Sequence, residues 1–162
     1  MKPNDFNLSG FLPYKLAVLA SRISKVLSTI YEERFGLSMP EWRVLVHVAR
    51  CEKVSVRDIH NCVNLEKPRV SRAVAKMVEA GLLAKTASTR DQRLVEIELT
   101  EAGQRVLNDI IPEAMSFQAR LMGAFSEDEA SHFDDLIEQL HDELDKHANA
   151  PRRSSMDTNI SD

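Results

Sequence analysis

The sequence predicts a mainly α-helical fold that contains one small β-hairpin. Over most of the 162 residues, hydrophobic side chains recur at spacings of three and four, the period of an amphipathic helix. The period becomes two at residues 95–99, where Val95, Ile97 and Leu99 alternate with Glu96 and Glu98. This alternation predicts a strand with one buried face. Helices therefore dominate, and the strands belong to one short region.

Two helices are predicted before residue 51. The first runs from Tyr14 to Glu33 and stops at Gly36, a residue type that often follows the last turn of a helix. The segment from Ser38 to Glu41 matches a capping box with a proline near the first helical position, which predicts the start of a second helix. The apolar face of the first helix comprises Leu16, Leu19, Ala20, Ile23, Val26, Leu27 and Ile30.

A pair of shorter helices follows, joined by a tight turn. Ser55 is placed to cap a helix from Val56 to Cys62. Asn64 lies in the turn, where asparagine tolerates the left-handed conformation. The next helix is expected from about Glu66 to Ala80, with Gly81 at its end.

The strands and the last two helices complete the chain. Residues 82–87 and 95–99 predict a hairpin with a polar tip. Thr100 caps a long helix that Pro112 is expected to kink. Residues 126–129 form a second capping box, which predicts a final helix with Phe133, Leu136, Ile137, Leu140 and Leu144 facing inward.

Composition narrows the class of protein. The chain is 43% hydrophobic and 28% charged, and no apolar run is long enough to span a bilayer. The first ten residues lack the apolar core of a signal peptide, so we expect a cytoplasmic protein with no membrane partner. Two cysteines are too few for a disulfide framework. The chain also lacks the GxSxG, P-loop and HExxH motifs, so we expect no enzyme activity, no cofactor and no metal site.

The net charge of −4 conceals an uneven distribution. Residues 101–162 contain 14 acidic and 5 basic side chains. By contrast, the stretch from Lys67 to Arg93 contains seven basic and two acidic side chains. A local basic surplus inside an acidic chain indicates an anionic partner.

The order of these elements predicts a winged helix-turn-helix. Such a fold places the second helix of the pair in the major groove of DNA. At about 100° per residue, Val70 and Val74 share one side of the helix over 66–80, while Arg69, Arg72 and Lys76 lie opposite. One side therefore suits a core and the other suits DNA.

Other basic and polar residues extend this candidate surface. Lys67 and the Ser71 hydroxyl lie near the start of the same helix, where phosphate oxygens bind favourably. At the hairpin tip, Arg90 and Arg93 are expected to reach the neighbouring minor groove. Asp91 is expected to hold Arg93 by accepting its hydrogen bonds.

These features resemble the MarR family of bacterial transcriptional regulators. The matching segments, within residues 12–147, are PEWRVLVHV, NLEKPRVSRAVAKMVEAGLL and RDQRLVEIELTEAG, the last with an Asp-x-Arg wing motif at residues 91–93. The resemblance implies a homodimer with interlocked terminal helices that binds a pseudo-palindromic operator on double-stranded DNA. The full set of candidate DNA-binding residues is Arg57, Lys67, Pro68, Arg69, Ser71, Arg72, Lys76, Arg90, Asp91 and Arg93.

The expected domain organisation follows from the same elements. Residues 1–11 form an N-terminal extension, and residues 12–147 form one domain. Within it, a winged lobe covers about 38–99, and dimerisation helices cover about 12–35 and 101–147. Their apolar stripes are longer than a lobe of about 60 residues can cover, which independently favours a dimer. Residues 148–162 are polar and aperiodic, and we expect them to be disordered.

The expected function is a repressor of a nearby operon that a small molecule releases from DNA. The family resemblance implies an aromatic carboxylate or phenol as effector, with Arg22, Trp42 and His47 as candidate ligand-binding residues. Arginine pairs with carboxylates, and tryptophan stacks on rings. Two alternatives are a redox-responsive regulator acting through Cys51, beside the cation Arg50, and a winged protein-interaction module without specific DNA binding.

Overall fold

The computed structural model describes residues 6–51, 54–63, 65–87, 95–151 and 153. By their internal contacts, the residues divide into two compact units, Met1–Met39 and Pro40–Asp162. The division falls close to the predicted start of the winged lobe at residue 38.

The first unit consists of a short 3-10 helix and one long α-helix. The 3-10 helix, η2, covers Leu8–Gly10 and is capped by the side chain of Asn7. Helix α1 covers Leu12–Phe35 and ends at Gly36, whose φ of 65° is left-handed. This ending confirms the predicted stop, because residues other than glycine rarely adopt such a backbone conformation.

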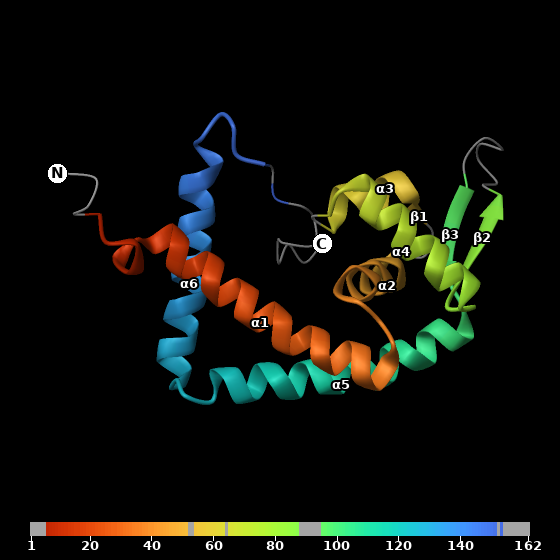
Figure 1. Ribbon diagram of the computed structural model, residues 1–162, viewed down its shortest axis with the longest axis horizontal. Coiled ribbons are helices and arrows are strands. Elements are labelled where there is room, and N and C mark those ends of the chain that lie inside the picture. Colours follow the sequence, from red (N-terminus) through yellow and green to blue (C-terminus); the bar gives the residue numbers. More distant parts are fainter. Residues whose placement is uncertain (1–5, 52–53, 64, 88–94, 152, 154–162) are drawn as a thin grey trace. The chain divides into compact units, whose positions relative to one another are not determined.

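The second unit contains the predicted pair of short helices, a small sheet and two long helices (Figure 1). Helices α3 and α4 pack on each other, and α4 also contacts β2. The elements in chain order are α2 (Met39–Arg50), β1 (Val54–Ser55), α3 (Val56–Cys62), α4 (Lys67–Glu79), β2 (Leu83–Ala87), β3 (Val95–Leu99), α5 (Glu101–Met122) and α6 (Glu127–Asp145).

The sheet differs from the predicted two-stranded hairpin. It has three antiparallel strands in the order β1-β3-β2, because Val54 pairs with Ile97 and Ser55 with Glu96. Strand β1 therefore connects the start of α3 to the wing. The expected buried face of β3 is also only partly buried: Ile97 is fully enclosed, whereas Val95, at the first position of β3 and paired with Ala87, is 49% exposed.

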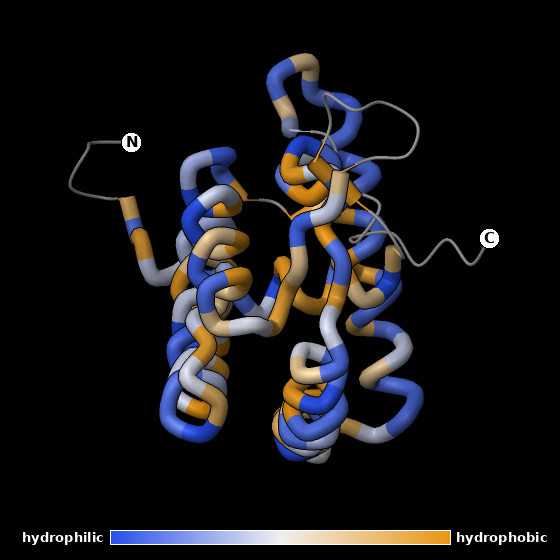
Figure 2. The backbone as a smooth tube through the Cα atoms, turned by 90° about the vertical axis from the view of Figure 1, so that its right-hand side faces the viewer, coloured by the Kyte–Doolittle hydropathy of each residue, from blue (hydrophilic) through white to orange (hydrophobic). Residues whose placement is uncertain are grey.

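The core of the second unit lies between α2, α3, α4, the sheet and the first turns of α5. Figure 2 shows hydrophobic and hydrophilic residues alternating along the helices, which gives each helix a side suited to packing. The most fully buried side chains are Val44, Leu45, Val48, Ile59, Val70, Val74, Met77, Leu83, Ile97 and Ile110.

The long helices α5 and α6 begin at caps that the sequence predicts. The Thr100 side chain accepts a hydrogen bond from the Gly103 N–H, and helix α5 continues through Pro112. Ser126 and Glu129 form the predicted capping box of α6. However, the apolar stripe of α6 is exposed in this chain rather than turned inward; it comprises Phe133, Leu136, Ile137, Leu140 and Leu144. Among the described helices, none is long and apolar enough to cross a membrane.

The predicted disordered tail lies mostly outside the described residues, since 152 and 154–162 are not among them. Arg153 is described, and it lies within the segment that the sequence predicts to be disordered. Its guanidinium donates two hydrogen bonds to the Glu138 carboxylate, at 2.8 and 3.0 Å. These hydrogen bonds connect Arg153 to helix α6.

Candidate nucleic-acid interface

Helix α4 has one buried and one exposed side, as the sequence predicts. The buried side packs into the core through Val70, Ala73, Val74 and Met77. The candidate DNA-binding residues of this helix are all exposed; they are Lys67, Pro68, Arg69, Ser71, Arg72 and Lys76. The core therefore fixes which side of α4 is presented to a partner.

The first turn of α4 is suited to an anion. Its N-cap residue, Glu66, makes no side-chain capping hydrogen bond, and Pro68 lies in the first turn. The Glu66 carbonyl accepts from the Arg69 N–H at 2.9 Å. Helix N-termini carry a partial positive charge, and Lys67 adds a full one. Phosphate oxygens therefore fit this end of the helix.

The turn before α4 is held by His60. The Nδ1 atom of its ring lies 2.7 Å from the Leu65 carbonyl oxygen, a distance that fits an N–H···O hydrogen bond. Helix α3 is itself fixed by a capping box, in which Ser55 Oγ accepts from the Asp58 N–H and the Asp58 carboxylate accepts from the Ser55 N–H. Arg57 is exposed in the first turn of this helix.

Lys76 differs from the other cations of α4. Its Nζ lies 2.9 Å from a carboxylate oxygen of Glu41, whose side chain is only 6% exposed. Glu41 lies in the first turn of α2. By its spacing along the helix, Lys76 is predicted to be a DNA-facing cation like Arg69 and Arg72, whereas the structure places its ammonium group against a buried acid of the core.

The wing is described only in its two strands. Thr86 on β2 donates a hydrogen bond of 2.7 Å to the Glu98 carboxylate on β3, which links the strands through side chains. The predicted tip residues Arg90, Asp91 and Arg93 lie outside the described residues. Their assignment to DNA stays a prediction.

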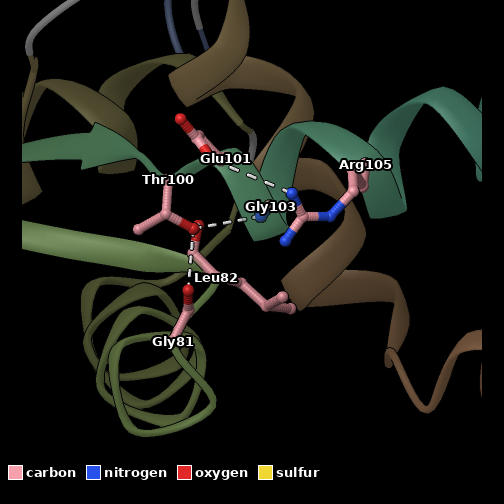
Figure 3. A network of polar contacts seen from close by, with 6 residues as sticks. All are labelled: Gly81, Leu82, Thr100, Glu101, Gly103 and Arg105. Carbon is pink, nitrogen blue, oxygen red and sulfur yellow. Dashed lines mark hydrogen bonds and ion pairs between the residues drawn. The ribbon is translucent and has the colours of Figure 1, made fainter.

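A polar network connects the end of α4 to the start of α5 (Figure 3). The Thr100 hydroxyl lies 2.7 Å from the Gly81 carbonyl oxygen and 3.0 Å from the Leu82 carbonyl oxygen, and accepts from the Gly103 N–H. A Cβ on Gly103 would lie only 2.2 Å from the Leu82 carbonyl oxygen. Glycine is therefore needed inside α5 because the helix approaches another part of the backbone.

The three candidate ligand-binding residues have different environments. Arg22 is exposed on α1, in the first unit, and Trp42 is half-buried on α2, in the second. His47 on α2 is 2% exposed, and among the described residues neither of its ring nitrogens has a hydrogen-bond partner. Burial lowers the pKa of His47, while Asp58 raises it and Arg50 lowers it. A shared pocket for these residues stays a prediction.

Sequence reasoning missed two features of this surface. One is the Glu41–Lys76 ion pair, which joins helices that are separated along the chain by α3. The other is the contact at Gly103. A glycine inside an otherwise regular helical pattern is a signal of close packing, but the pattern does not identify the neighbouring backbone.

Comparisons with known proteins agree with this geometry. The MarR family model matches residues 35–94. The chain is 19% identical over 122 residues to the uncharacterized HTH-type transcriptional regulator YdgJ of Bacillus subtilis, covering 75% of this chain and 74% of that protein. A MarR/EmrR family regulator from Acinetobacter sp. ADP1 is 27% identical, with a TM-score of 0.77 over 88% of this chain and all of that one.

Two further solved structures share the fold at lower identity. A mutant of MarR from E. coli, solved in complex with operator DNA, is 14% identical, with a TM-score of 0.72 and coverage of 80% of this chain and 92% of that one. BpsR of Bordetella bronchiseptica, whose DNA binding is described as regulated by 6-hydroxynicotinic acid, is 18% identical, with a TM-score of 0.76 and coverage of 85% and 97%.

A two-sided helix behind a tight turn, followed by a small antiparallel sheet, defines the class of winged helix-turn-helix proteins. Within that class, a MarR family model matches residues 35–94, a MarR/EmrR family structure shares the fold, and the curated relatives are HTH-type transcriptional regulators. Together these findings support a MarR-family, DNA-binding transcriptional regulator. Members of this family are regulators and not enzymes.

Proposed function

We propose that this regulator is a homodimeric repressor whose two α4 helices bind the halves of a pseudo-palindromic operator. The observation that carries the proposal is the exposed side of α4, opposite its buried valines. Arg69 and Arg72 are the base-reading residues, since arginine pairs bidentately with guanine. Phosphate and groove contacts come from Arg57, Lys67, Pro68, Ser71 and the wing residues Arg90, Asp91 and Arg93.

The dimer follows from the exposed apolar surface of α6. Five large hydrophobic side chains on one helix are each at least 36% exposed, and together they form a stripe that a second chain can cover. We assign the dimer interface to residues 12–35 and 101–147. A twofold dimer places two recognition helices about 34–36 Å apart, the spacing of successive major grooves.

The effector in this proposal is a small aromatic carboxylate or phenol. A regulator of the same fold, BpsR, is described as controlled by 6-hydroxynicotinic acid, which combines an aromatic ring with a carboxylate. In this chain Arg22, Trp42 and His47 supply a cation, a ring and an imidazole for such a molecule. If the effector binds more tightly when the α4 helices have a spacing that does not fit DNA, it shifts the population away from the DNA-binding form.

The experiment is a selection of duplexes from a randomised pool, followed by affinity measurements across a salt series. We expect a two-fold symmetric sequence and a steep loss of affinity with salt, because each neutralised phosphate contributes a slope of about −0.9. Adding a panel of benzoates, hydroxynicotinates and phenols should release the duplex with at least one compound.

Each result bears on a different part of the proposal. Selection of an asymmetric or random sequence would contradict the dimeric binding of a two-fold operator. Salt-insensitive binding would favour a protein-interaction module. Binding that withstands every compound would remove the effector class while leaving the DNA-binding function intact.

A further inference from the structure

We infer that Glu41 and Lys76 are a positioning pair that fixes the recognition helix on α2, and that Lys76 is not a DNA-contacting cation. The inference rests on the proposed DNA-binding role of α4 and deepens it. It assigns a role to a buried acid that lies outside the proposed contact surface, and it removes one cation from that surface.

Glu41 is the most buried partner among the ion pairs of the described residues. Lys76 Nζ and a Glu41 carboxylate oxygen are 2.9 Å apart, and only 6% of the Glu41 side chain is exposed. The Arg105–Glu101 pair on α5 is longer, at 3.9 Å, and both of its side chains are largely exposed. Charges attract more strongly where water is partly excluded, as it is around the Glu41 carboxylate, while the Lys76 side chain itself is 61% exposed.

The pair links α4 to α2, in addition to the packing of α4 on α3 and β2. Glu41 lies in the first turn of α2, and Lys76 lies in the last turn of α4. The buried side of α4 consists of Val70, Ala73, Val74 and Met77, whose apolar contacts are non-directional. A shift of α4 away from α2 would separate the Glu41 carboxylate from its ammonium partner, which is costly for a buried charge.

The position of Lys76 along α4 also separates it from the DNA-reading end. With a rise of about 1.5 Å per residue, its Cα lies about 14 Å along the axis from Lys67. Recognition helices contact base edges with their N-terminal residues. Arg69 and Arg72 belong to that part of α4, whereas the ammonium group of Lys76 is directed to α2.

The inference predicts that the loss of the Glu41–Lys76 pair changes the specificity of DNA binding but not its dependence on salt. The probes are a duplex selected by the wild-type protein from a randomised pool, and a scrambled duplex of the same composition. The variants are Lys76→Met, Lys76→Arg, Glu41→Gln, Arg72→Met and Arg105→Met, each verified as folded by circular dichroism. Affinity for both probes is measured across a salt series.

We expect Lys76→Met to keep the wild-type salt slope but to lower the ratio of selected to scrambled affinity about tenfold. Lys76→Arg should keep the wild-type affinity ratio, because a guanidinium group also pairs with the Glu41 carboxylate. Arg72→Met should instead reduce the slope or the affinity for the selected duplex directly. Arg105→Met, which removes the same charge from an exposed pair, should change neither quantity.

Glu41→Gln provides an independent test if Lys76→Met does not fold. It keeps the size of the side chain and removes only the charge that holds Lys76. We expect the same loss of the affinity ratio, accompanied by equal or tighter binding to the scrambled duplex, since Lys76 becomes available to phosphates.

Two results would overturn the inference alone. One is a slope that falls by about 0.9 in Lys76→Met, the value for one lost phosphate contact. The other is an unchanged affinity ratio in both Lys76→Met and Glu41→Gln. A wild-type chain without any salt-dependent preference for its selected duplex would overturn the proposed function, and the inference with it.

Discussion

Arg72 is the residue on which the proposed base reading depends most directly. It is exposed on the side of α4 opposite the buried Val70 and Val74. We expect Arg72→Ala to weaken binding to the selected duplex by about 1–3 kcal/mol and to relax specificity at one base pair. Isothermal titration or fluorescence anisotropy with single-base variants of the duplex measures both effects.

The matched control is Arg105→Ala, which removes an exposed arginine on α5. If both variants bind every duplex as the wild type does, α4 is not the reading helix. An equal loss in both variants would instead indicate a general effect of net charge.

His47 determines a different property, the dependence of stability on pH. Burial lowers its pKa below the ordinary value of 6.5, and the Asp58 carboxylate opposes this shift while Arg50 adds to it. The unfolded chain therefore binds a proton at a higher pH than the folded chain does. The free energy of unfolding should thus fall as the pH decreases from about 6.5 toward the lowered pKa.

We expect His47→Leu to remove this part of the pH dependence, whereas His147→Leu, at an exposed position after α6, should retain it. Urea denaturation at pH 7.5 and 5.5, at one protein concentration, gives the difference for each variant. An identical decrease in the wild type and in His47→Leu would show that other groups cause the acid sensitivity.

At the scale of elements, the junction between α4 and α5 depends on the absence of a side chain at Gly103. A Cβ there would lie 2.2 Å from the Leu82 carbonyl oxygen and 2.7 Å from a methyl carbon of Leu99. Because the Leu82 carbonyl oxygen belongs to the backbone and cannot rotate away as a side chain can, helix α5 must move to make room for the new methyl group. We expect Gly103→Ala to destabilise the protein by about 1–3 kcal/mol, despite the higher helix propensity of alanine.

Gly123→Ala is the control for that change. Gly123 has a helical φ of −65°, and a Cβ there meets nothing closer than 3.1 Å. Urea denaturation should show a much smaller effect for this variant. A Gly103→Ala protein as stable as the wild type would mean that α5 is free to shift without loss.

The elements themselves differ in how far the sequence predicts them. Local signals such as the Ser55 cap, the left-handed glycines and the Ser126 capping box lie within a few residues of the boundary they define, and those helices form where predicted. Strand β1 was not predicted, because two residues are too short to display a period. Its formation depends on β3, which lies about forty residues later.

In the candidate interface, too, the sequence predicts features that depend on neighbouring residues and does not predict those that depend on distant ones. The side of α4 that carries Arg69 and Arg72 is fixed by the spacing of its own valines, so the sequence predicts it. The partner of Lys76 is contributed by another helix, and no local pattern contains that information. The exposure of the α6 stripe likewise depends on whether a further chain covers it, which periodicity alone does not reveal.

At the scale of the whole molecule, the charges separate along the chain in a way that suits a DNA-binding dimer. Basic residues predominate between Lys67 and Arg93, and acidic residues predominate after residue 100. The acidic C-terminal helices are repelled by phosphate, whereas the basic stretch is attracted. In the proposed dimer, this distribution directs the basic stretch of each chain toward DNA and leaves the α6 stripe for protein contacts.

The proposed dimer interface gives the prediction that tests this arrangement. Leu140 lies within the exposed stripe of α6. We expect Leu140→Glu to convert the dimer to a monomer, because a dimer would bury the new carboxylate among apolar side chains. Ser131→Glu adds the same charge on the opposite side of α6 and should leave the dimer intact. Sedimentation velocity distinguishes the two states.

The same pair of variants links assembly to function. A monomer retains one α4 helix, so it should bind a single half-site weakly and gain nothing from a second half-site at the natural spacing. The Ser131→Glu dimer should keep the full preference for the two-fold symmetric duplex. If Leu140→Glu remains a dimer with full preference, the stripe on α6 is not the interface, and the contacts between chains must lie on another part of the molecule.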